Sequence, residues 1–255
     1  MSWDPDQYLK FADHRLRPAL DLVNAIPLTA PHLVCDLGCG AGNVTRLLRL
    51  RWPDARLIGV DTSAEMLSKA AGVLPDALWQ QADLADWAPP EPSDLIFSNA
   101  ALQWLPDHPA LFRRLVAQLA PDGVLAVQMP RNYDTPSHTG MRDAAEAGPW
   151  RDLLRPLLRH APVATAADYW AMLADLGVTA DIWLTEYLHV LSGDDPVVQW
   201  TLGTALRPLV AALDEPWRGA FLADYTVRMR AAYPTRADGT TLFPFRRLFI
   251  LARKG

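Results

Sequence analysis

Residues 34–43 read VCDLGCGAGN, in which an apolar run carrying Asp36 leads directly into Gly38, Gly40 and Gly42. Three glycines within five positions predict a turn with positive φ angles, where backbone can approach a bound molecule because no Cβ intervenes. An apolar strand followed by such a turn is typical of cofactor sites in open α/β sheets. We therefore expect strands and helices to alternate around this loop.

The first half of the chain shows that alternation, which predicts a doubly wound, Rossmann-like and mostly parallel sheet with helices on both faces. The predicted strands are HLVCDL (32–37), ARLIGVD (55–61), ALWQQADL (77–84), DLIFSNA (94–100) and GVLAVQM (123–129). The predicted helices are 43–53, ending at Pro53; 62–75, beginning with a Thr62–Glu65 capping box; and 107–123, beginning at Asp107.

After Met129 the pattern loosens, and turn formers mix with scattered aromatic residues up to residue 150. A helix is predicted over 165–177, a strand over 181–191, helices broken at Pro208 and Pro216 over 194–232, and a last strand over 245–254. The two late strands would complete a seven-stranded sheet, with a helical lid inserted before the last strand. We expect one domain, 1–255, made of an N-terminal helical lid (1–30), a cofactor-binding core (31–130) and late strands (131–255) with a helical substrate cap at about 192–243.

Composition excludes several classes of protein. The formal net charge of −5 offers no basic face for a nucleic-acid backbone. The N-terminus lacks a signal-peptide pattern and no apolar run approaches membrane-spanning length, so we expect a cytoplasmic protein with no membrane partner, acting as a monomer. The two cysteines, Cys35 and Cys39, lie in the glycine-loop region, and no other cysteine or nearby histidine completes a metal site or a disulfide, which predicts buried fillers and no metal site.

The residues around the glycine loop favour a cationic cofactor over a dinucleotide. A dinucleotide fingerprint, GxGxxG, would need glycine where this chain has Asn43. The Asp36 carboxylate, two residues before the first glycine, would repel a pyrophosphate. A ligand with an ammonium group, an adenosine and no phosphate fits better, because an ionised Asp36 can accept from the ammonium. S-adenosylmethionine (SAM) is such a ligand.

Two further acids lie at the C-terminal ends of the next two predicted strands. Asp61 ends its strand where a carboxylate can accept both ribose hydroxyls. Asp83 can accept from the adenine amino group while the Leu84 amide donates to the ring. A lone aspartate at a strand end is more often a helix cap or turn former, so the argument rests on three acids in this order.

Five segments resemble the successive motifs of class I SAM-dependent methyltransferases. They are DLGCGAG, GVDTSAEML, QADLADW, DLIFSNAALQWLPD and LAPDGVLAVQMP, which together cover residues 34–130 in order. The candidate cofactor-binding residues are Asp36, Gly38, Gly40, Gly42, Asp61, Thr62, Met66, Asp83, Leu84 and Asn99. Asn99 is expected at the methionine end of the cofactor, through its side-chain amide.

The resemblance continues outside those motifs. The segments WDPDQYLKFADHRLRPALDLV, NAALQWLPDHPALF, DIWLTEYLH and FRRLFILAR are similar to the branch of the family that methylates trans-aconitate. That likeness implies an O-methyltransferase that forms a methyl ester on a small polycarboxylic acid, with trans-aconitate as the acceptor and S-adenosylhomocysteine as the second product.

The residues after the fourth predicted strand also fit a carboxylate acceptor. Amino-methylating enzymes that act on adenine or glutamine carry NPPY or a relative there, whereas this chain has Asn99, Ala100, Ala101 and Leu102. A carboxylate with a pKa near 4 is already ionised at neutral pH, so no general base and no catalytic residue is expected. Gln103 and Trp104 would position the acceptor, although Trp104 could equally be a core residue. His108 is expected on the surface at a helix start.

The other carboxylates of such an acid need cationic partners, and arginine binds carboxylates through two parallel hydrogen bonds. Only Lys10, Lys69 and Lys254 among the 24 basic residues are lysines. Each arginine alone is typical of solvated surface. The candidates for substrate binding are Arg15, Arg17, Arg131, Arg207 and Arg246, with Arg247 as the neighbour that strand alternation would turn to the opposite side from Arg246.

For three of these arginines the sequence suggests a more specific role. Arg207 lies in the apolar stretch TALRPLV, where a lone charge is costly unless it faces a partner. Arg15 or Arg17 could instead bind the cofactor's carboxylate. Three alternative functions stay open: methylation of another small acid or a hydroxyl compound, cofactor binding without catalysis, and nicotinamide-dependent reduction.

Overall fold

The computed structural model describes residues 16–158 and 163–255. The chain divides into two compact units. The first comprises Met1–Pro130, Val163–Thr185 and Arg247–Gly255, and the second comprises Arg131–Pro162 and Glu186–Arg246. Of the sequence-based expectations, Arg15 lies outside the described residues.

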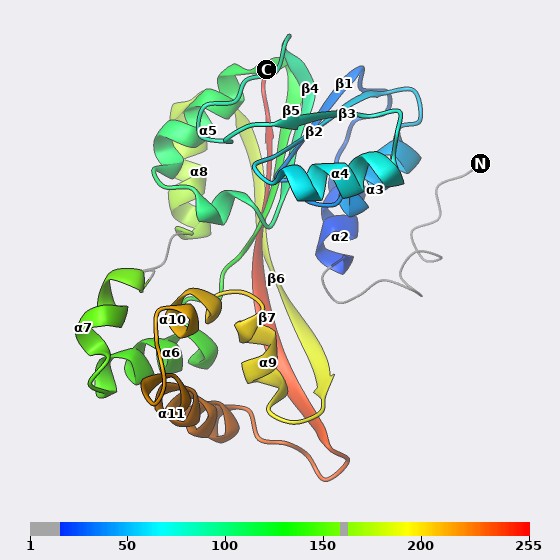
Figure 1. Ribbon diagram of the computed structural model, residues 1–255. Coiled ribbons are helices and arrows are strands. Elements are labelled where there is room, and N and C mark those ends of the chain that lie inside the picture. The colour runs from blue at the N-terminus through cyan, green and yellow to red at the C-terminus, as the bar shows by residue number, and fades with distance from the viewer. Residues whose placement is uncertain (1–15, 159–162) are drawn as a thin grey trace. The chain divides into compact units, whose positions relative to one another are not determined.

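The sheet has seven strands, as predicted, and their order is β3-β2-β1-β4-β5-β7-β6 (Figure 1). Its strands are β1 (Leu33–Leu37), β2 (Arg56–Asp61), β3 (Leu78–Gln81), β4 (Ser93–Asn99), β5 (Leu119–Pro130), β6 (Thr179–Ser192) and β7 (Thr240–Arg253). The strands from β3 to β5 run parallel, whereas β7 pairs antiparallel with β5. The mostly parallel, doubly wound sheet is therefore confirmed.

The register of the parallel strands brings several predicted site residues to one edge. Asp36 of β1 lies level with Gly59 of β2 and Phe97 of β4. Two residues later come the glycine loop, Asp61 and Asn99. Since carboxyl ends of parallel strands meet at the same edge, the sheet itself gathers these residues.

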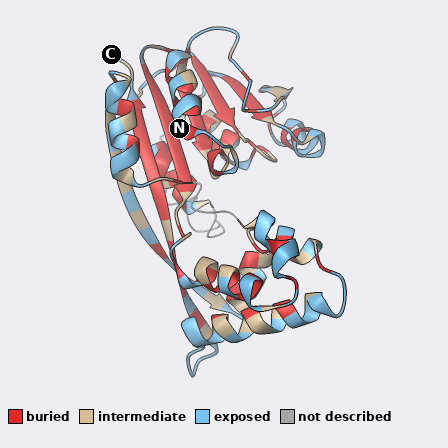
Figure 2. Cartoon of the chain, turned by 90° about the vertical axis from the view of Figure 1, so that its left-hand side faces the viewer, coloured by how far each residue is buried: buried red, intermediate tan, exposed pale blue. Residues whose placement is uncertain are grey.

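Helices cover both faces of the sheet in the first unit. These helices are α2 (Arg17–Ala25), α3 (Asn43–Arg51), α4 (Ala64–Val73), α5 (His108–Ala117) and α8 (Ala166–Asp175). The helices α2, α3 and α4 form one contacting group, and α5 contacts α8. All five residues of β1 are buried, as expected for a parallel strand covered on both faces (Figure 2).

The helix starts in this unit test the predicted caps. At α5, Asp107 is the N-cap and its side chain accepts from the Ala110 amide at 3.2 Å, as predicted. At α4 the capping box was wrong, because the N-cap is Ser63, whose hydroxyl accepts from the Met66 amide at 3.3 Å. Thr62 stays outside the helix.

The second unit contains α6 (Pro136–Ala147), α7 (Arg151–Leu154), the 3₁₀ helix η2 (Arg155–Leu157), α9 (Pro196–Leu202), α10 (Arg207–Ala211) and α11 (Trp217–Ala232). The helices α9 to α11 follow β6 and precede β7 in the chain, where a helical insertion was predicted. Pro208 stands in the first turn of α10 and Pro216 is the N-cap of α11. Both prolines therefore begin helices, because the first turn needs no internal amide donor.

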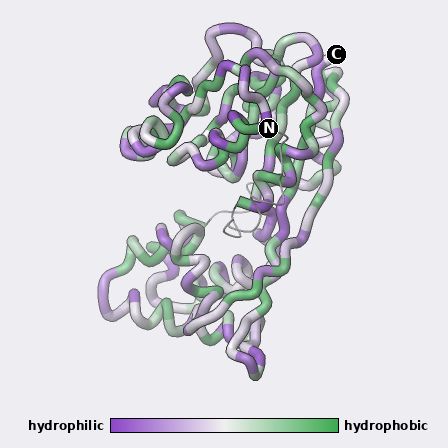
Figure 3. Tube along the Cα trace, turned by 90° about the vertical axis from the view of Figure 1, so that its right-hand side faces the viewer, coloured by the Kyte–Doolittle hydropathy of each residue, from purple (hydrophilic) through white to green (hydrophobic). Residues whose placement is uncertain are grey.

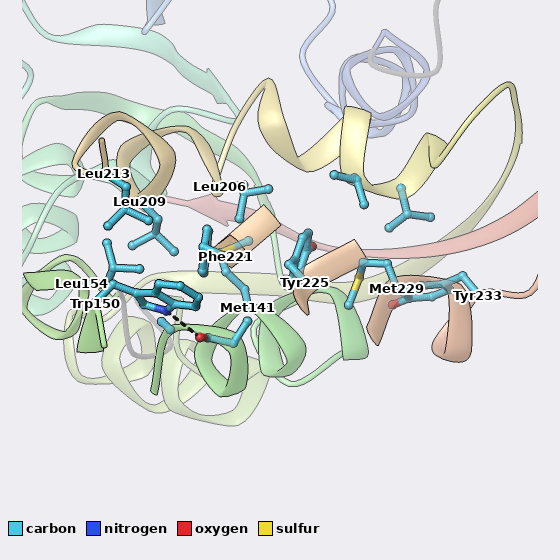
Figure 4. Close-up of a cluster of buried hydrophobic side chains, with 14 of the residues drawn as sticks. Met141, Trp150, Leu154, Leu206, Leu209, Leu213, Phe221, Tyr225, Met229 and Tyr233 are labelled. Carbon is cyan, nitrogen blue, oxygen red and sulfur yellow. Dashed lines mark hydrogen bonds between the residues drawn. The ribbon is translucent and has the colours of Figure 1, made fainter. Parts of the chain in front are cut away.

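The second unit has its own hydrophobic core (Figure 4). Trp150 packs edge-on against Phe221 of α11, and its indole donates to the Ala144 carbonyl of α6 at 2.9 Å. Helix α6 was missed in the sequence, because PSHTGMRDAAEA combines turn formers with few large apolar residues. Its small residues, Gly140, Ala144 and Ala145, are all buried.

The colouring by hydropathy in Figure 3 shows hydrophobic positions along the central strands and mixed positions along the helices that cover them. That distribution is typical of helices with one buried side. Within residues 16–158 and 163–255, no helix is long and apolar enough to cross a membrane.

Candidate active site

The glycine loop joins β1 to α3, and each of its three glycines has a positive φ angle: 74° at Gly38, 54° at Gly40 and 79° at Gly42. A Cβ on Gly38 would lie 2.2 Å from the Ala101 Cβ, and one on Gly42 would lie 3.1 Å from Ala70. A Cβ on Gly40 would meet no described atom within 4 Å. Packing therefore requires glycine at 38 and 42, while Gly40 borders open space into which a ligand can reach.

Asp36 is buried behind this loop, and its carboxylate accepts from the Thr45 hydroxyl of α3 at 2.6 Å. Burial raises the pKa of Asp36 to about 7; the Thr45 hydrogen bond opposes that rise and the Asp61 charge adds to it. The sequence suggested a carboxylate that is ionised at neutral pH. The structure instead gives a group that titrates near neutrality until a cation stabilises its charged form.

Asp61 ties the glycine loop to the start of α4. One carboxylate oxygen accepts from the Gly40 amide and the other from the Ser63 amide, both at 2.9 Å. Each oxygen keeps further acceptor capacity, since an ionised carboxylate accepts about four hydrogen bonds. Asp61 can therefore hold the loop and still accept from ligand hydroxyls.

The remaining predicted cofactor ligands lie beside β2 and β3. Thr62 and Met66 are exposed, and the Thr62 carbonyl accepts from the Gln81 side chain at 3.1 Å. Asp83 is exposed and accepts from the Ala85 amide at 2.9 Å, so it also forms a local turn. The Leu84 side chain is buried.

The segment after β4 is held in an unusual conformation. Ala100 has a φ of 56°, a left-handed value that costs a non-glycine residue on the order of 1 kcal/mol. Its amide donates to the Gln128 carbonyl at 2.9 Å, and its carbonyl accepts from the Gln103 side chain at 2.7 Å. The Asn99 Oδ1 is buried without a hydrogen-bond partner among the described residues. A ligand donor at this edge would satisfy it.

Gln103 and Trp104 follow in a 3₁₀ helix, η1 (Leu102–Trp104). Gln103 is buried, and its Oε1 has no partner among the residues described. Trp104 is 51% exposed, which excludes the core interpretation left open by the sequence. A large exposed aromatic side chain next to the carboxyl edge is suited to contact a ligand.

His108 was expected on the surface, and that expectation was wrong. It is the first residue of α5, but it is buried. One ring nitrogen pairs with the Tyr169 hydroxyl of α8, and the other lies 3.0 Å from the Leu102 carbonyl. No periodic signal marks this burial, because the partner Tyr169 lies 61 residues away. His108 holds the segment that carries Gln103 and Trp104.

The arginine candidates differ sharply in their surroundings. Arg17 and Arg207 are exposed, so the expected cost of a lone charge at Arg207 was wrong: water solvates it. Arg131 lies 3.6 Å from Asp134, and Arg246 pairs with Asp134 at 3.2 Å and with Glu186 at 3.8 Å. Arg247 is only 4% exposed, which confirms that strand alternation turns it away from its neighbour.

The two cysteines are unreactive thiols at neutral pH. Cys35 and Cys39 are both buried free thiols, as predicted. Burial raises the pKa of Cys35 to about 11 and raises that of Cys39 further, so neither thiolate forms at neutral pH. Among residues 16–158 and 163–255, no three His, Cys, Asp or Glu side chains are grouped to hold a metal ion.

A glycine loop bordering open space, with carboxylates from β1 and β2, is the geometry expected of a nucleoside-binding edge. Comparison with known families shows which family the chain belongs to. Residues 8–181 match the model of a family described as a methyltransferase domain. The chain belongs to this methyltransferase family.

Individual methyltransferases support the assignment. A protein of Azoarcus sp. (strain BH72), named trans-aconitate 2-methyltransferase, is 51% identical over 98% of both chains. A structure from Bacillus halodurans C-125 superposes with a TM-score of 0.64 at 12% identity, covering 93% of this chain and 99% of that one, a likeness that concerns the fold. The Rossmann-like methyltransferase fold and the predicted resemblance are confirmed.

One further methyltransferase structure contains a ligand. Phosphoethanolamine N-methyltransferase 2 of Haemonchus contortus, solved in complex with S-adenosyl-L-methionine, matches with a TM-score of 0.57 at 16% identity. The match covers 93% of this chain and 52% of that one. At this identity the likeness concerns the fold alone.

Proposed function

We propose that this methyltransferase transfers the methyl group of SAM to a carboxylate of trans-aconitate, forming a methyl ester. The observation that carries the proposal is the identity of 51%, along nearly the whole chain, with a protein named trans-aconitate 2-methyltransferase. Identity at that level covers the segments after residue 130 as well as the motifs that the wider family shares. The acceptor is therefore inferred from more than the cofactor-binding core.

The residues at the carboxyl edge fit SAM. The open space at Gly40 admits a ligand against the backbone, and the partnerless Asn99 Oδ1 can accept from the methionine ammonium. Asp36 lies behind the same loop and supplies negative charge once ionised. Asp61 has acceptor capacity left for the ribose hydroxyls after binding two amides. Thr62, Met66, Asp83 and Leu84 would surround the adenosine.

When bound, SAM supplies an electrophilic methyl group on a positively charged sulfur. The acceptor carboxylate is ionised at neutral pH, so the protein need not remove a proton. Gln103 and Trp104 would instead fix the acceptor's position, and alignment of two reactants accounts for much of the rate in such displacements. Because the charges of sulfonium and carboxylate neutralise each other during transfer, exclusion of water favours the reaction.

The proposal is tested by incubating the protein with methyl-labelled SAM and a panel of acids and alcohols, then identifying products by mass. We expect one monomethyl ester, formed fastest from trans-aconitate. Turnover of a different acid or of a hydroxyl compound, with none of trans-aconitate, would show that trans-aconitate is not the acceptor. Cofactor binding without turnover of any compound would favour a non-catalytic binding protein.

Thermal unfolding separates SAM from a nicotinamide cofactor. A ligand at 100 times its dissociation constant stabilises the folded state by about 2.7 kcal/mol, which raises the melting temperature measurably. We expect S-adenosylhomocysteine to produce this shift and NAD to produce none. The reverse result would favour a reductase.

A further inference from the structure

A row of polar side chains crosses one face of the sheet beyond the glycine loop. Asn99 of β4 lies level with Gln128 of β5, and Gln128 lies level with Phe249 of β7. Arg247 is two residues from Phe249, and strand side chains alternate, so Arg247 and Gln128 share a face. The Arg247 Nη1 donates to the Gln128 Oε1 at 3.3 Å. These three residues form the β4–β5–β7 polar row.

Two members of the row, Gln128 and Arg247, are buried, which is unusual for such polar groups. Gln128 is 0% exposed and Arg247 is 4% exposed. A buried guanidinium costs free energy unless its surroundings compensate the charge. Gln128 and Arg247 therefore form a buried polar pair on this face of the sheet.

Hydrogen bonding within the row leaves the side-chain amide donor of Gln128 without a partner among the described residues. A guanidinium has only donors, so the Gln128 atom that faces Arg247 must be the side-chain oxygen, Oε1. The Gln128 Nε2 therefore points elsewhere, and it is buried without a partner among the described residues. An amide donor beside a guanidinium is suited to an anionic oxygen group, and the carboxylates of the proposed acceptor acid are such groups.

The row lies at the edge where the first unit gathers its site residues. The Gln128 carbonyl accepts from the Ala100 amide, so Gln128 is attached to the segment that leads to Gln103 and Trp104. Neighbouring strands are spaced about 4.8 Å apart, which puts β5 roughly 10 Å and β7 roughly 14 Å from β1 and its glycine loop. A carboxylate bound there belongs to a molecule placed beyond the nucleoside.

We propose that Arg247 and Gln128 bind a carboxylate of the acceptor acid that is not methylated, and thereby select acids with more than one carboxylate. This inference rests on the proposed function, since it assigns a specificity determinant to that reaction. The guanidinium of Arg247 supplies charge, and the Gln128 Nε2 supplies the donor that completes the carboxylate's coordination. Gln128 keeps Arg247 oriented while no acid is bound.

Gln128→Glu is the sharpest test, because it changes the row without removing volume. The new carboxylate would pair with Arg247 inside the fold and replace the Nε2 donor by an acceptor. We expect the KM for trans-aconitate to rise roughly 10- to 100-fold, the effect of losing hydrogen bonds to a charged group. The dissociation constant for S-adenosylhomocysteine, measured by calorimetry, should change by less than about twofold, because the substitution leaves the proposed cofactor-binding residues unchanged.

Two further variants complete the test. Arg247→Lys keeps the charge but loses the planar fork, so the KM should rise by a smaller factor. Arg253→Gln is the matched control on the same strand: Arg253 is exposed, pairs with Asp122 at 2.9 Å and should leave both constants unchanged.

The outcomes separate the two claims. A wild-type protein that methylates no acid would overturn the proposed function together with this inference. An active wild type with an unchanged acid KM in Gln128→Glu would overturn the inference alone. Weakened cofactor binding in Gln128→Glu, with an unchanged acid KM, would likewise overturn it and place the row at the cofactor's own carboxylate.

Discussion

The Gly40 amide donates to the Asp61 carboxylate at 2.9 Å, joining the glycine loop after β1 to the end of β2. The same carboxylate accepts from the Ser63 amide at the start of α4. One side chain thus fixes two backbone segments and presents acceptor capacity to a ligand between them. Its removal should affect the shape of the site as well as a direct contact.

We predict that Asp61→Ala mainly raises the cofactor's KM, because ribose contacts are equal in ground and transition states. The rise should be roughly 10- to 100-fold, and the free energy of unfolding should fall by about 1–3 kcal/mol because two amides lose their acceptor. Steady-state kinetics and urea unfolding measure the two effects. A large fall in kcat with an unchanged cofactor KM would contradict this role.

Asp36 predicts a pH dependence of cofactor affinity. Its pKa is about 7 in the ligand-free protein, and a cationic ligand favours the ionised carboxylate. Binding therefore releases a proton at low pH, and affinity should fall by up to about tenfold for each pH unit below about 7. Calorimetry between pH 5.5 and 8.5 in buffers of different ionisation enthalpy measures the affinity and the proton release.

The same raised pKa affects stability with a definite sign. An unfolded aspartate ionises near pH 4, whereas folded Asp36 keeps its proton to about pH 7, so stability falls as pH rises between these values. That fall is on the order of 4 kcal/mol. Asp36→Asn should flatten this part of the profile, whereas Asp86→Asn, an exposed control, should not. Equal pH profiles for both variants would refute the assignment.

Alanine substitutions at two glycines of the loop should have different effects, one on the stability of the fold and the other on cofactor binding. Gly38→Ala would bring a Cβ to 2.2 Å from the Ala101 Cβ, so we expect severe destabilisation, about 3 kcal/mol or more. Gly40→Ala meets open space and strains only φ, which costs about 1–2 kcal/mol. This second variant should fold and lose cofactor affinity. Retention of full affinity in Gly40→Ala would show that no ligand approaches there.

Arg207→Ala tests whether Arg207, in the second unit, binds the acceptor acid as predicted. Arg207 is exposed at the first residue of α10, so its removal should leave the free energy of unfolding within about 0.5 kcal/mol of the wild type. We expect a higher KM for the acid and an unchanged dissociation constant for S-adenosylhomocysteine. Lost cofactor binding in calorimetry would rule out this role.

The sequence predicted the features that depend on local chemistry. Three glycines close together indicate positive φ angles, and an acid after an apolar run indicates the end of a strand. The loop and the position of Asp61 at the end of β2 could therefore be predicted. The Ser63 cap was missed because Thr62 and Ser63 are both good N-caps, and only the backbone path selects between them. Helix α6 was missed because packing within the second unit, and not its own periodicity, stabilises it.

Long-range partners were beyond the sequence. Alternation could separate Arg246 from Arg247, but the choice of the buried one needed the pairing of β7 with β5. His108 looked like a surface helix start, because Asp107 and Pro109 beside it are exposed turn and helix-start residues. Its burial depends on Tyr169, which only the fold brings to it.

The link from Tyr169 through His108 to the Leu102 carbonyl predicts a positioning role. The Nε2 of His108 faces a carbonyl and must carry hydrogen, so the other nitrogen accepts from the Tyr169 hydroxyl. His108→Phe keeps the aromatic packing against Phe112 but removes both of these hydrogen bonds, which should cost about 1–3 kcal/mol of stability. Because Gln103 and Trp104 follow Leu102, kcat should fall roughly tenfold or more while cofactor affinity is kept. Tyr169→Phe retains the His108–Leu102 contact and should lower kcat less; equal activity in His108→Phe and the wild type would show that the contact is only structural.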